Sequence, residues 1–162
     1  LDMCTGSGAI AISLVKYVDK ALVYASDISK RALKIAEENA TRNLASVAFF
    51  ESDVFKNILP LYQFDIIVSN PPYIETEVMK TLSKEVQAEP SLALDGGEDG
   101  LKFYKEIIKK AKEYLNEDGY LAFEIGYNQR EAVENLFKEY GYKNVYSKKD
   151  LAGNDRVVVA QK

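Results

Sequence analysis

The chain contains no histidine and no tryptophan, and Cys4 is its single cysteine. Without an imidazole, a mechanism that needs a histidine base is excluded, and no histidine can activate the Cys4 thiol as a nucleophile. We therefore expect Cys4 to serve packing. One cysteine forbids an internal disulfide and suits a reducing compartment, by default the cytoplasm. Clusters of cysteine and histidine with metal-ligand spacing are also lacking, so we predict no metal site.

Long apolar runs and basic runs are lacking too. No stretch approaches the length of a membrane span, and no signal peptide pattern is visible. The formal net charge is -4, and no basic run is interleaved with aromatic residues, which argues against a nucleic-acid backbone as the main partner. The lysines between Leu101 and Leu115 are interrupted by Glu106 and Glu113 and predict a solvated helix face. We expect neither a membrane nor nucleic acid as a direct partner.

What is present fits a single α/β domain over residues 1–162, with 47% hydrophobic and 28% charged residues. Helical patterns alternate with strand patterns, which predicts a mostly parallel sheet with helices on both faces. The helical patterns cover 9–17, 29–43, 100–115 and 128–140, and the strand patterns surround Leu22, Val47, Asp65 and Tyr120.

Three other segments break this alternation. Two strand patterns at 142–147 and 157–160 have no helix between them and predict an antiparallel pair. Asn116–Gly119 predicts a turn between a helix and a strand. The irregular stretch 75–100 is either a lid or recognition segment over a substrate or a poorly ordered loop.

The most informative segment is Asn70-Pro71-Pro72-Tyr73, which follows the apolar strand pattern 64–69. Ligands of open α/β sheets bind outside the carboxyl ends of the strands, and two prolines stiffen the backbone at this point. The Asn70 side-chain oxygen and the Pro71 carbonyl can then accept both hydrogens of one planar NH2 group, with Tyr73 as a flat surface against it. The alternative is a rigid turn in which Asn70 bonds its own backbone.

A glycine turn, Cys4-Thr5-Gly6-Ser7-Gly8, lies between a strand end and the first helical pattern. Gly6 and Gly8 let the backbone approach a ligand closely, and the following helix offers N–H groups to a carboxylate or phosphate. We expect a small, partly anionic ligand here. Because residues 6–11 also fit the dinucleotide fingerprint, a nicotinamide oxidoreductase remains an alternative.

Acidic residues follow the next two strand patterns. Asp27 lies about 20 residues beyond the glycines, the spacing of a ribose-binding acid. Its alternative role, the N-cap of the next helix, is filled at least as well by Ser29. Asp53 and Val54 follow the strand pattern 47–51. Because the carboxyl ends of parallel strands meet at one edge, we expect Asp27, Asp53 and Asn70 to line one rim.

With these segments the chain resembles the class I S-adenosylmethionine-dependent methyltransferases, and within them the protein-glutamine N5-methyltransferases that modify peptide chain release factors. The resemblance runs along the whole chain. The matching segments are 4–8, 26–29, 52–55, 68–74, Glu89-Pro90, 95–101, Glu124-Ile125-Gly126 and 149–156. Because the Asn-Pro-Pro-Tyr segment also occurs in relatives with other substrates, an N-methyltransferase of a nucleic-acid base or of a ribosomal-protein glutamine remains an alternative.

The resemblance implies a Rossmann-like fold, S-adenosyl-L-methionine as cofactor, and methyl transfer to the glutamine in the Gly-Gly-Gln loop of class I release factors, which modulates translation termination. It implies that the cofactor contacts Cys4, Thr5, Gly6, Ser7, Gly8, Asp27 and Asn70. It further implies that Asp53 bonds the adenine amino group while Val54 lies against the ring. Asn70 and the Pro71 carbonyl would hold the substrate amide, in a catalytic segment completed by Pro72 and Tyr73.

Two positions depart from the family pattern. Cys4 stands where glycine is common, and Val54 stands where tryptophan is common. Because Cys4 carries a side chain, we expect its backbone to avoid a positive φ.

The start of the sequence carries an expectation of its own. Leu1 and Asp2 directly precede the glycine turn, so we expect that most of a central first strand is missing and that the chain is truncated there. The family also has an N-terminal helical domain that helps bind the release factor, and this sequence has no counterpart to it. A cofactor-binding fragment without activity is therefore a further alternative. We expect a monomer.

Overall fold

The computed structural model describes residues 1–83 and 90–162. Within them a seven-stranded sheet has the order β3-β2-β1-β4-β5-β7-β6, in which β7 runs antiparallel to both of its neighbours and the other pairs are parallel. The strands are β1 (Asp2–Met3), β2 (Val23–Asp27), β3 (Val47–Glu51), β4 (Phe64–Ser69), β5 (Leu115–Glu124), β6 (Lys143–Lys149) and β7 (Asp155–Gln161). The predicted parallel sheet and its antiparallel ending are confirmed.

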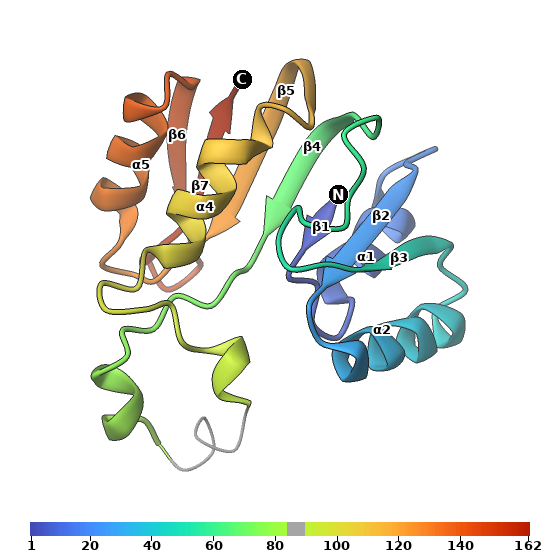
Figure 1. Cartoon of the computed structure of the whole chain (residues 1–162), viewed down its shortest axis with the longest axis horizontal. Helices are drawn as coiled ribbons and strands as arrows, with labels where there is room; N and C mark the ends of the chain where they lie inside the picture. Colours follow the sequence, from blue (N-terminus) through green and yellow to red (C-terminus); the bar gives the residue numbers. More distant parts are fainter. Residues whose placement is uncertain (84–89) are drawn as a thin grey trace.

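Helices lie on both faces of this sheet (Figure 1). They are α1 (Ala9–Tyr17), α2 (Lys30–Arg42), α4 (Lys102–Ala111) and α5 (Arg130–Glu139), with short 3-10 turns η1 (Val78–Thr81) and η2 (Ser91–Ala93). The helices α1 and α2 pack on β2 and β3, whereas α4 and α5 pack together over β5, β6 and β7. Strand order runs in opposite directions from β1, so right-handed crossovers place these two helix pairs on opposite faces.

Helix positions follow from the apolar spacing of the sequence. In α4, Tyr104, Ile107, Ile108 and Ala111 are fully buried at the i, i+3, i+4, i+7 spacing of one helix face. The lysines of this helix point to solvent, as predicted. None of the described helices is both long enough and apolar enough to cross a membrane.

The main core lies between the sheet and the α4–α5 pair. Leu121 and Phe123 of β5 and Ile125, directly after it, point into this core at a spacing of two, all with no exposed surface. On the opposite face of β4 and β5 no described helix covers the sheet, and Ile66 and Tyr120 are 51% and 37% exposed there. Coverage of both faces is therefore complete only over part of the sheet.

The turn predicted at Asn116–Gly119 is wrong. These residues lie inside β5, between Leu115, which pairs with Phe64, and Tyr120, which pairs with Ile66. The register shift bulges the strand, and Asp118 adopts a φ of 62° within the bulge. Turn-forming residues indicated a local reversal, but pairing with β4 on both sides of them keeps the segment in the strand.

Candidate functional site

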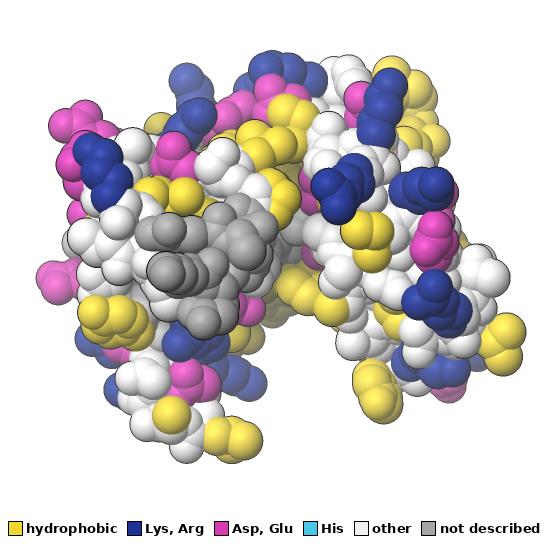
Figure 2. All heavy atoms as spheres, turned by 90° about the horizontal axis from the view of Figure 1, so that it is seen from below, with side chains coloured by type: hydrophobic (Ala, Val, Ile, Leu, Met, Phe, Trp, Pro, Cys, Tyr) yellow, Lys and Arg dark blue, Asp and Glu magenta, His cyan; other side chains and the backbone are white. Residues whose placement is uncertain are grey.

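The candidate site lies at the carboxyl edge of the sheet, where the strand order reverses between β1 and β4. Met3 and Ser69, the last residues of these strands, are register partners, and the Ser69 hydroxyl donates to the Met3 carbonyl at 2.7 Å. The glycine turn and the Asn70 segment therefore leave the sheet side by side. In open α/β sheets this switch point is where ligands bind. Seen from this edge, the molecule is hollowed between the α2 half and the α4–α5 half (Figure 2).

The glycine turn has a left-handed backbone at Cys4, Gly6 and Gly8. Gly6 and Gly8 have φ of 56° and 83°. Among the described residues, no atom other than those of Gly6 and its two chain neighbours lies within 4 Å of the position that a Cβ on Gly6 would take. Gly8 is the N-cap of α1 and packs closely on Ala36, 3.1 Å from the position of its missing Cβ. The turn thus exposes bare backbone at Gly6 and seats the helix at Gly8, which suits close approach of a ligand.

The expectation of a negative φ at Cys4 is wrong, because its φ is 59°. The chain must bend sharply as it leaves β1, and the Thr5 N–H and Gly8 N–H fix the bend by donating to the Ser26 and Thr5 carbonyls at 3.0 and 2.9 Å. These bonds hold a conformation that disfavours a side chain by about 1 kcal/mol. Burial raises the pKa of the Cys4 thiol to about 12, so the thiol is neutral and unreactive.

Asp27, at the end of β2, ties the glycine turn to α2. Its Oδ2 accepts a hydrogen bond from the Gly6 N–H and its Oδ1 accepts one from the Ser29 N–H, both at 2.9 Å. The N-cap of α2 is Ser29, whose hydroxyl accepts from the Ala32 N–H at 3.2 Å. Because Ser29 takes the capping role, the half-buried Asp27 carboxylate is left at the rim with lone pairs available for hydroxyl donors.

Asp53 and Val54 follow β3 at the same edge. Asp53 forms an ion pair with the exposed Lys56. Val54 is buried in the main core and has a φ of 50°, which is strained for a β-branched residue. The Ser52 hydroxyl donates to the Val54 carbonyl at 2.8 Å and stabilises this turn. The predicted rim of strand ends is therefore present, with Asp53 outward and the Val54 side chain inward.

The segment Asn70–Tyr73 changes from exposed to buried along its length. Asn70 is exposed, Pro71 and Pro72 are buried, and Tyr73 is half-buried. No described residue hydrogen-bonds the Asn70 side chain, and none donates to the Pro71 carbonyl. The alternative turn, in which Asn70 bonds its own backbone, is absent. Two acceptors next to the glycine turn are thus free to receive the hydrogens of an NH2 group.

The stretch after Tyr73 folds back on this segment. Ile74 N–H donates to the Leu94 carbonyl at 2.9 Å, and Gly96 N–H donates to the Ile74 carbonyl at 2.8 Å. Thr76 N–H adds a bond of 3.0 Å to the Gly97 carbonyl. The described part of 75–100 is therefore hydrogen-bonded to the candidate site. Glu89, which belongs to the predicted recognition stretch, lies outside the described residues.

Sequence reasoning assigned no role to Asp2, which the structure places beneath the glycine turn. Asp2 has no exposed surface, and its Oδ2 accepts from the Thr5 hydroxyl at 2.5 Å and from the Ala11 N–H at 3.0 Å. Its Oδ1 has no described hydrogen-bond partner. Burial raises the pKa of this carboxyl to about 6, an effect that the bonds to Thr5 and Ala11 partly offset. The sequence signal that could have indicated this role is an acidic residue in the strand that leads into the glycine turn.

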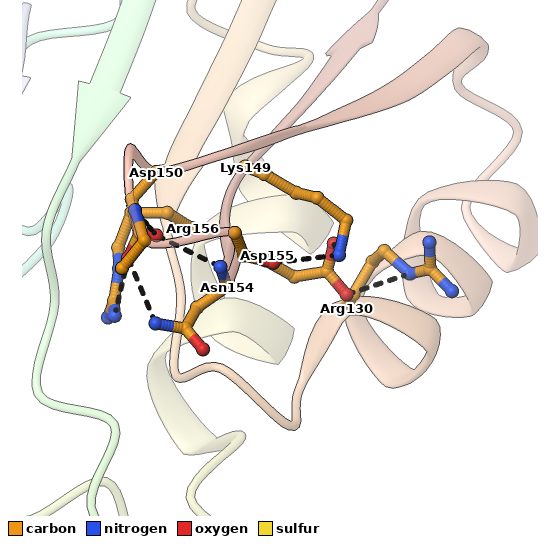
Figure 3. A network of polar contacts seen from close by, with 8 residues as sticks. Arg130, Lys149, Asp150, Asn154, Asp155 and Arg156 are labelled. Atoms are coloured by element: carbon orange, nitrogen blue, oxygen red, sulfur yellow. Dashed lines mark hydrogen bonds and ion pairs between the residues drawn. The ribbon is translucent and has the colours of Figure 1, made fainter.

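Figure 3 shows a polar network at the β6–β7 hairpin that includes Asp150 and Arg156. The Arg156 side chain of this network interacts with the Tyr73 hydroxyl. Arg156 donates to Asp150 Oδ2 through Nε and Nη2, at 3.3 and 3.2 Å, and to the Ile125 carbonyl through Nη1 at 3.3 Å. Burial raises the pKa of the Tyr73 hydroxyl, the carboxylate of Glu124 adds to this, and the guanidinium of Arg156 partly offsets it. The network therefore places a cation near the Tyr73 hydroxyl.

Comparison with known proteins identifies this arrangement. Residues 1–98, more than half of the chain, match the family model described as "Methyltransferase small domain". The chain belongs to this methyltransferase family. Its glycine turn is therefore that of a methyltransferase domain, which excludes the nicotinamide oxidoreductase. The curated relatives include the release factor glutamine methyltransferases of Fusobacterium nucleatum and Thermodesulfovibrio yellowstonii, 44% and 42% identical over the whole of this chain. The methyltransferase domain spans 46% and 58% of these two proteins, about half of their length.

Solved structures show the same fold. A methyltransferase from Pyrococcus furiosus matches all of this chain over 74% of its own, with a TM-score of 0.73 and 19% identity. A ribosomal protein L11 methylase from Lactobacillus delbrueckii subsp. bulgaricus matches 99% of this chain over 68% of its own, with a TM-score of 0.69 and 25% identity. The domain has the Rossmann-like class I methyltransferase fold that the sequence predicts.

Proposed function

We propose that this methyltransferase domain transfers the methyl group of S-adenosyl-L-methionine to the side-chain amide nitrogen of the glutamine in the Gly-Gly-Gln loop of class I peptide chain release factors. The observation that carries this proposal is the pair of free acceptors, the Asn70 side-chain oxygen and the Pro71 carbonyl, beside the glycine turn. The names of the curated relatives select a glutamine amide among the NH2 groups that such a pair can hold. In this proposal the 162 residues act as one catalytic domain, in the cytoplasm.

The rim of strand ends fits the cofactor. Bare backbone at Gly6 and the α1 N-terminus suit its carboxylate, and the Asp27 carboxylate has lone pairs for two ribose hydroxyls. We assign contacts with the methionine part to Cys4, Thr5, Gly6, Ser7 and Gly8. We assign the ribose to Asp27 and the adenine to Asp53 and Val54. We place Asn70 between the cofactor and the substrate, in contact with both.

The main task of the protein in this reaction is to align the substrate amide nitrogen with the methyl group of the cofactor. When bound, the cofactor would supply an electrophilic methyl group on its sulfonium, with its thioether as the leaving group, so no acid or base is needed to activate it. The amide nitrogen becomes acidic on gaining the methyl group and then loses one of its two protons to solvent. An amide nitrogen is a poor nucleophile, and Asn70 and Pro71 compensate by orienting its two hydrogens and by placing partial negative charge where positive charge develops. Pro72 keeps this backbone stiff, and Tyr73 supports the planar amide.

A methylation assay with a panel of candidate substrates tests the substrate assignment. The protein is incubated with methyl-labelled S-adenosylmethionine and, in separate reactions, a class I release factor, ribosomal protein L11, and single- and double-stranded DNA and RNA of mixed sequence. We expect label on the release factor alone, and loss of that label when the Gly-Gly-Gln glutamine is replaced. Label on L11 or on a nucleic acid, without label on the release factor, overturns the assignment.

A further inference from the structure

Gln129, the residue before α5, is a buried side chain to which neither the family assignment nor the proposed function gives a role. It is 8% exposed. Its amide meets three segments that lie far apart in the sequence. The Nε2 donates to the Tyr73 carbonyl at 3.0 Å and to the Gly100 carbonyl at 3.4 Å. The Oε1 accepts from the Gly126 N–H at 3.0 Å. It also lies 3.3 Å from the Tyr104 hydroxyl, which shares its one hydrogen with the Glu124 carbonyl at 3.0 Å.

These contacts fix which end of the amide faces which segment. Two carbonyls face the NH2 group, and an N–H and a hydroxyl face the oxygen. A reversed amide would set oxygen against the two carbonyls and the NH2 group against the Gly126 N–H, which places acceptor on acceptor and donor on donor. A glutamate of the same shape keeps the oxygen contacts but loses both donated bonds. The arrangement therefore requires an amide and not only a side chain of this size.

Two glycines, Gly100 and Gly126, lie directly against the side-chain amide of Gln129. A Cβ on Gly100, whose φ is 67°, would lie 2.5 Å from the Tyr73 carbonyl oxygen and 2.7 Å from Gln129 Nε2. A Cβ on Gly126 would lie 2.9 Å from Gln129 Oε1. Any side chain at either position would displace the amide from its partners. The absence of a side chain at both positions therefore leaves room for the Gln129 amide.

A short stretch of backbone with restricted freedom connects the Tyr73 carbonyl, which Gln129 binds, to the two proposed substrate acceptors. Only Pro71 and Pro72 separate Tyr73 from Asn70, both are buried, and each ring fixes its own φ. Because the φ angles of Pro71 and Pro72 are fixed, fewer backbone rotations can absorb a shift of the Tyr73 peptide before it reaches the Pro71 carbonyl and Asn70. Gln129 itself is held at the start of α5, where the next residue, Arg130, forms an ion pair with Asp155 at 3.4 Å.

We propose that Gln129 is a positioning residue of the methyl transfer, which holds the Asn70–Tyr73 segment in register with the cofactor by gripping the Tyr73 carbonyl. This proposal rests on the proposed function for its effect on catalysis. The bracing of the segment is a property of the fold and is measurable without a substrate. Gln129 touches neither the substrate nor the cofactor, and its effect is confined to how accurately the two acceptors are placed.

The decisive variant is Gln129→Glu, with Tyr142→Phe as its matched control. Tyr142 lies at the other end of α5, and its buried hydroxyl donates to the Ile108 carbonyl at 2.9 Å, so the control also removes a buried hydrogen bond that joins the α4–α5 pair. For Gln129→Glu we expect kcat for release factor methylation to fall at least tenfold at pH 8, while the Kd for S-adenosylmethionine changes less than twofold. The activity should recover partly as the pH is lowered, because a protonated carboxyl can again donate to the Tyr73 carbonyl. Tyr142→Phe should leave both quantities within twofold of the wild type at every pH.

Hydrogen exchange separates this proposal from the proposed function. In Gln129→Glu the amides of Ile74, Thr76 and Gly96, which join the segment to the following loop, should exchange at least tenfold faster at pH 8, and those of β2 should not change. If the wild-type protein methylates no release factor, the proposed function fails, and faster exchange at these three amides still supports the bracing. Unchanged exchange together with unchanged kcat overturns the proposal. A loss of kcat that merely tracks a loss of thermal stability, without recovery at low pH, also overturns it.

Discussion

The two halves of the carboxyl edge are braced by different chemistry. On the β1–β2 side, carboxylates hold the glycine turn: Asp2 bonds Thr5 and Ala11, and Asp27 bonds Gly6. On the β4–β5 side, a neutral amide, Gln129, holds the segment that carries Asn70. Carboxylates only accept hydrogen bonds, so they suit a turn that presents N–H groups, whereas an amide can also donate to the carbonyls of a proline-rich segment that has few N–H groups.

This difference has a consequence for pH. Asp2 titrates near neutral pH because burial raises its pKa to about 6. Gln129 does not titrate, so the bracing of Asn70 does not change between acid and alkaline solution. The cofactor side should therefore respond to pH while the substrate side should not. The predictions below break or sharpen this contrast.

Removing the amide of Asn70 should impair the substrate side much more than the cofactor side. For Asn70→Ala we expect kcat for release factor methylation to fall about 100-fold or more, the range for losing one positioned polar group in an active site. The Kd for S-adenosylmethionine, measured by calorimetry, should change only a few-fold. Asn57→Ala, which removes an exposed amide bonded to the Glu51 carbonyl, serves as control and should keep full activity. A larger loss of cofactor affinity than of kcat would contradict the assigned role.

Titration of Asp2 should make stability depend on pH. A carboxyl whose pKa rises from 3.8 to about 6 on folding contributes stability that is fully present below pH 4 and is lost as the pH rises to about 6. The size of the shift corresponds to about 3 kcal/mol. We expect the unfolding free energy of the wild type to fall by about 2 kcal/mol, relative to Asp2→Asn, between pH 4 and pH 7 in urea titrations. Parallel pH profiles for the two proteins would show that Asp2 does not titrate in this range.

Loss of charge at Asp27 should weaken binding of the cofactor without disturbing the substrate side. Asp27→Asn keeps one acceptor oxygen but loses a charged hydrogen-bond acceptor, so we expect the Kd for S-adenosylmethionine to rise about tenfold. With saturating cofactor, kcat should remain within threefold of the wild type. Glu51→Gln is the matched control, because this carboxylate ends the next strand and, among the described residues, pairs only with the exposed Lys30. Equal effects of the two variants on Kd would remove the case for Asp27 as the ribose acid.

The smallest effect is expected at the Tyr73 hydroxyl. Tyr73→Phe keeps the ring against the substrate amide and removes only the group beside Arg156, so we expect kcat to change less than threefold. Tyr73→Leu removes the flat surface and should cost about tenfold. The ratio of these two effects, measured in the same methylation assay, shows whether the ring or the hydroxyl matters. A larger effect of Tyr73→Phe would assign the hydroxyl a direct part in the reaction.

Much of the architecture was predictable because its signals are local. The helix at Ala9–Tyr17 was predicted with the bounds that the structure has, and Ser29 was correctly preferred as the cap of α2. Spacing of apolar residues and capping chemistry act over a few residues, so sequence patterns carry them. The rim formed by Asp27, Asp53 and Asn70 also followed, because parallel strands end at one edge.

The contacts that sequence patterns missed are long-range. Gln129 lies 56 residues from Tyr73, and nothing in its own neighbourhood distinguishes it from an ordinary residue at the start of a helix. Cys4 has a positive φ because hydrogen bonds from Thr5 and Gly8 fix the exit from β1, not because of its own preference. The bulge at Asn116–Gly119 likewise depends on pairing with β4. In each case a tertiary contact overrides the local preference of the residue.

The position of the transferred methyl group tests the central claim most directly. After incubation with S-adenosylmethionine and a class I release factor, the peptide that contains the Gly-Gly-Gln loop is isolated and fragmented in a mass spectrometer. The account predicts one added methyl, 14 Da by elementary mass, on the glutamine side chain with the wild-type protein, and none above background with Asn70→Ala. A methyl group on another residue, or an equal yield with Asn70→Ala, would contradict the claim that Asn70 and Pro71 hold the substrate amide.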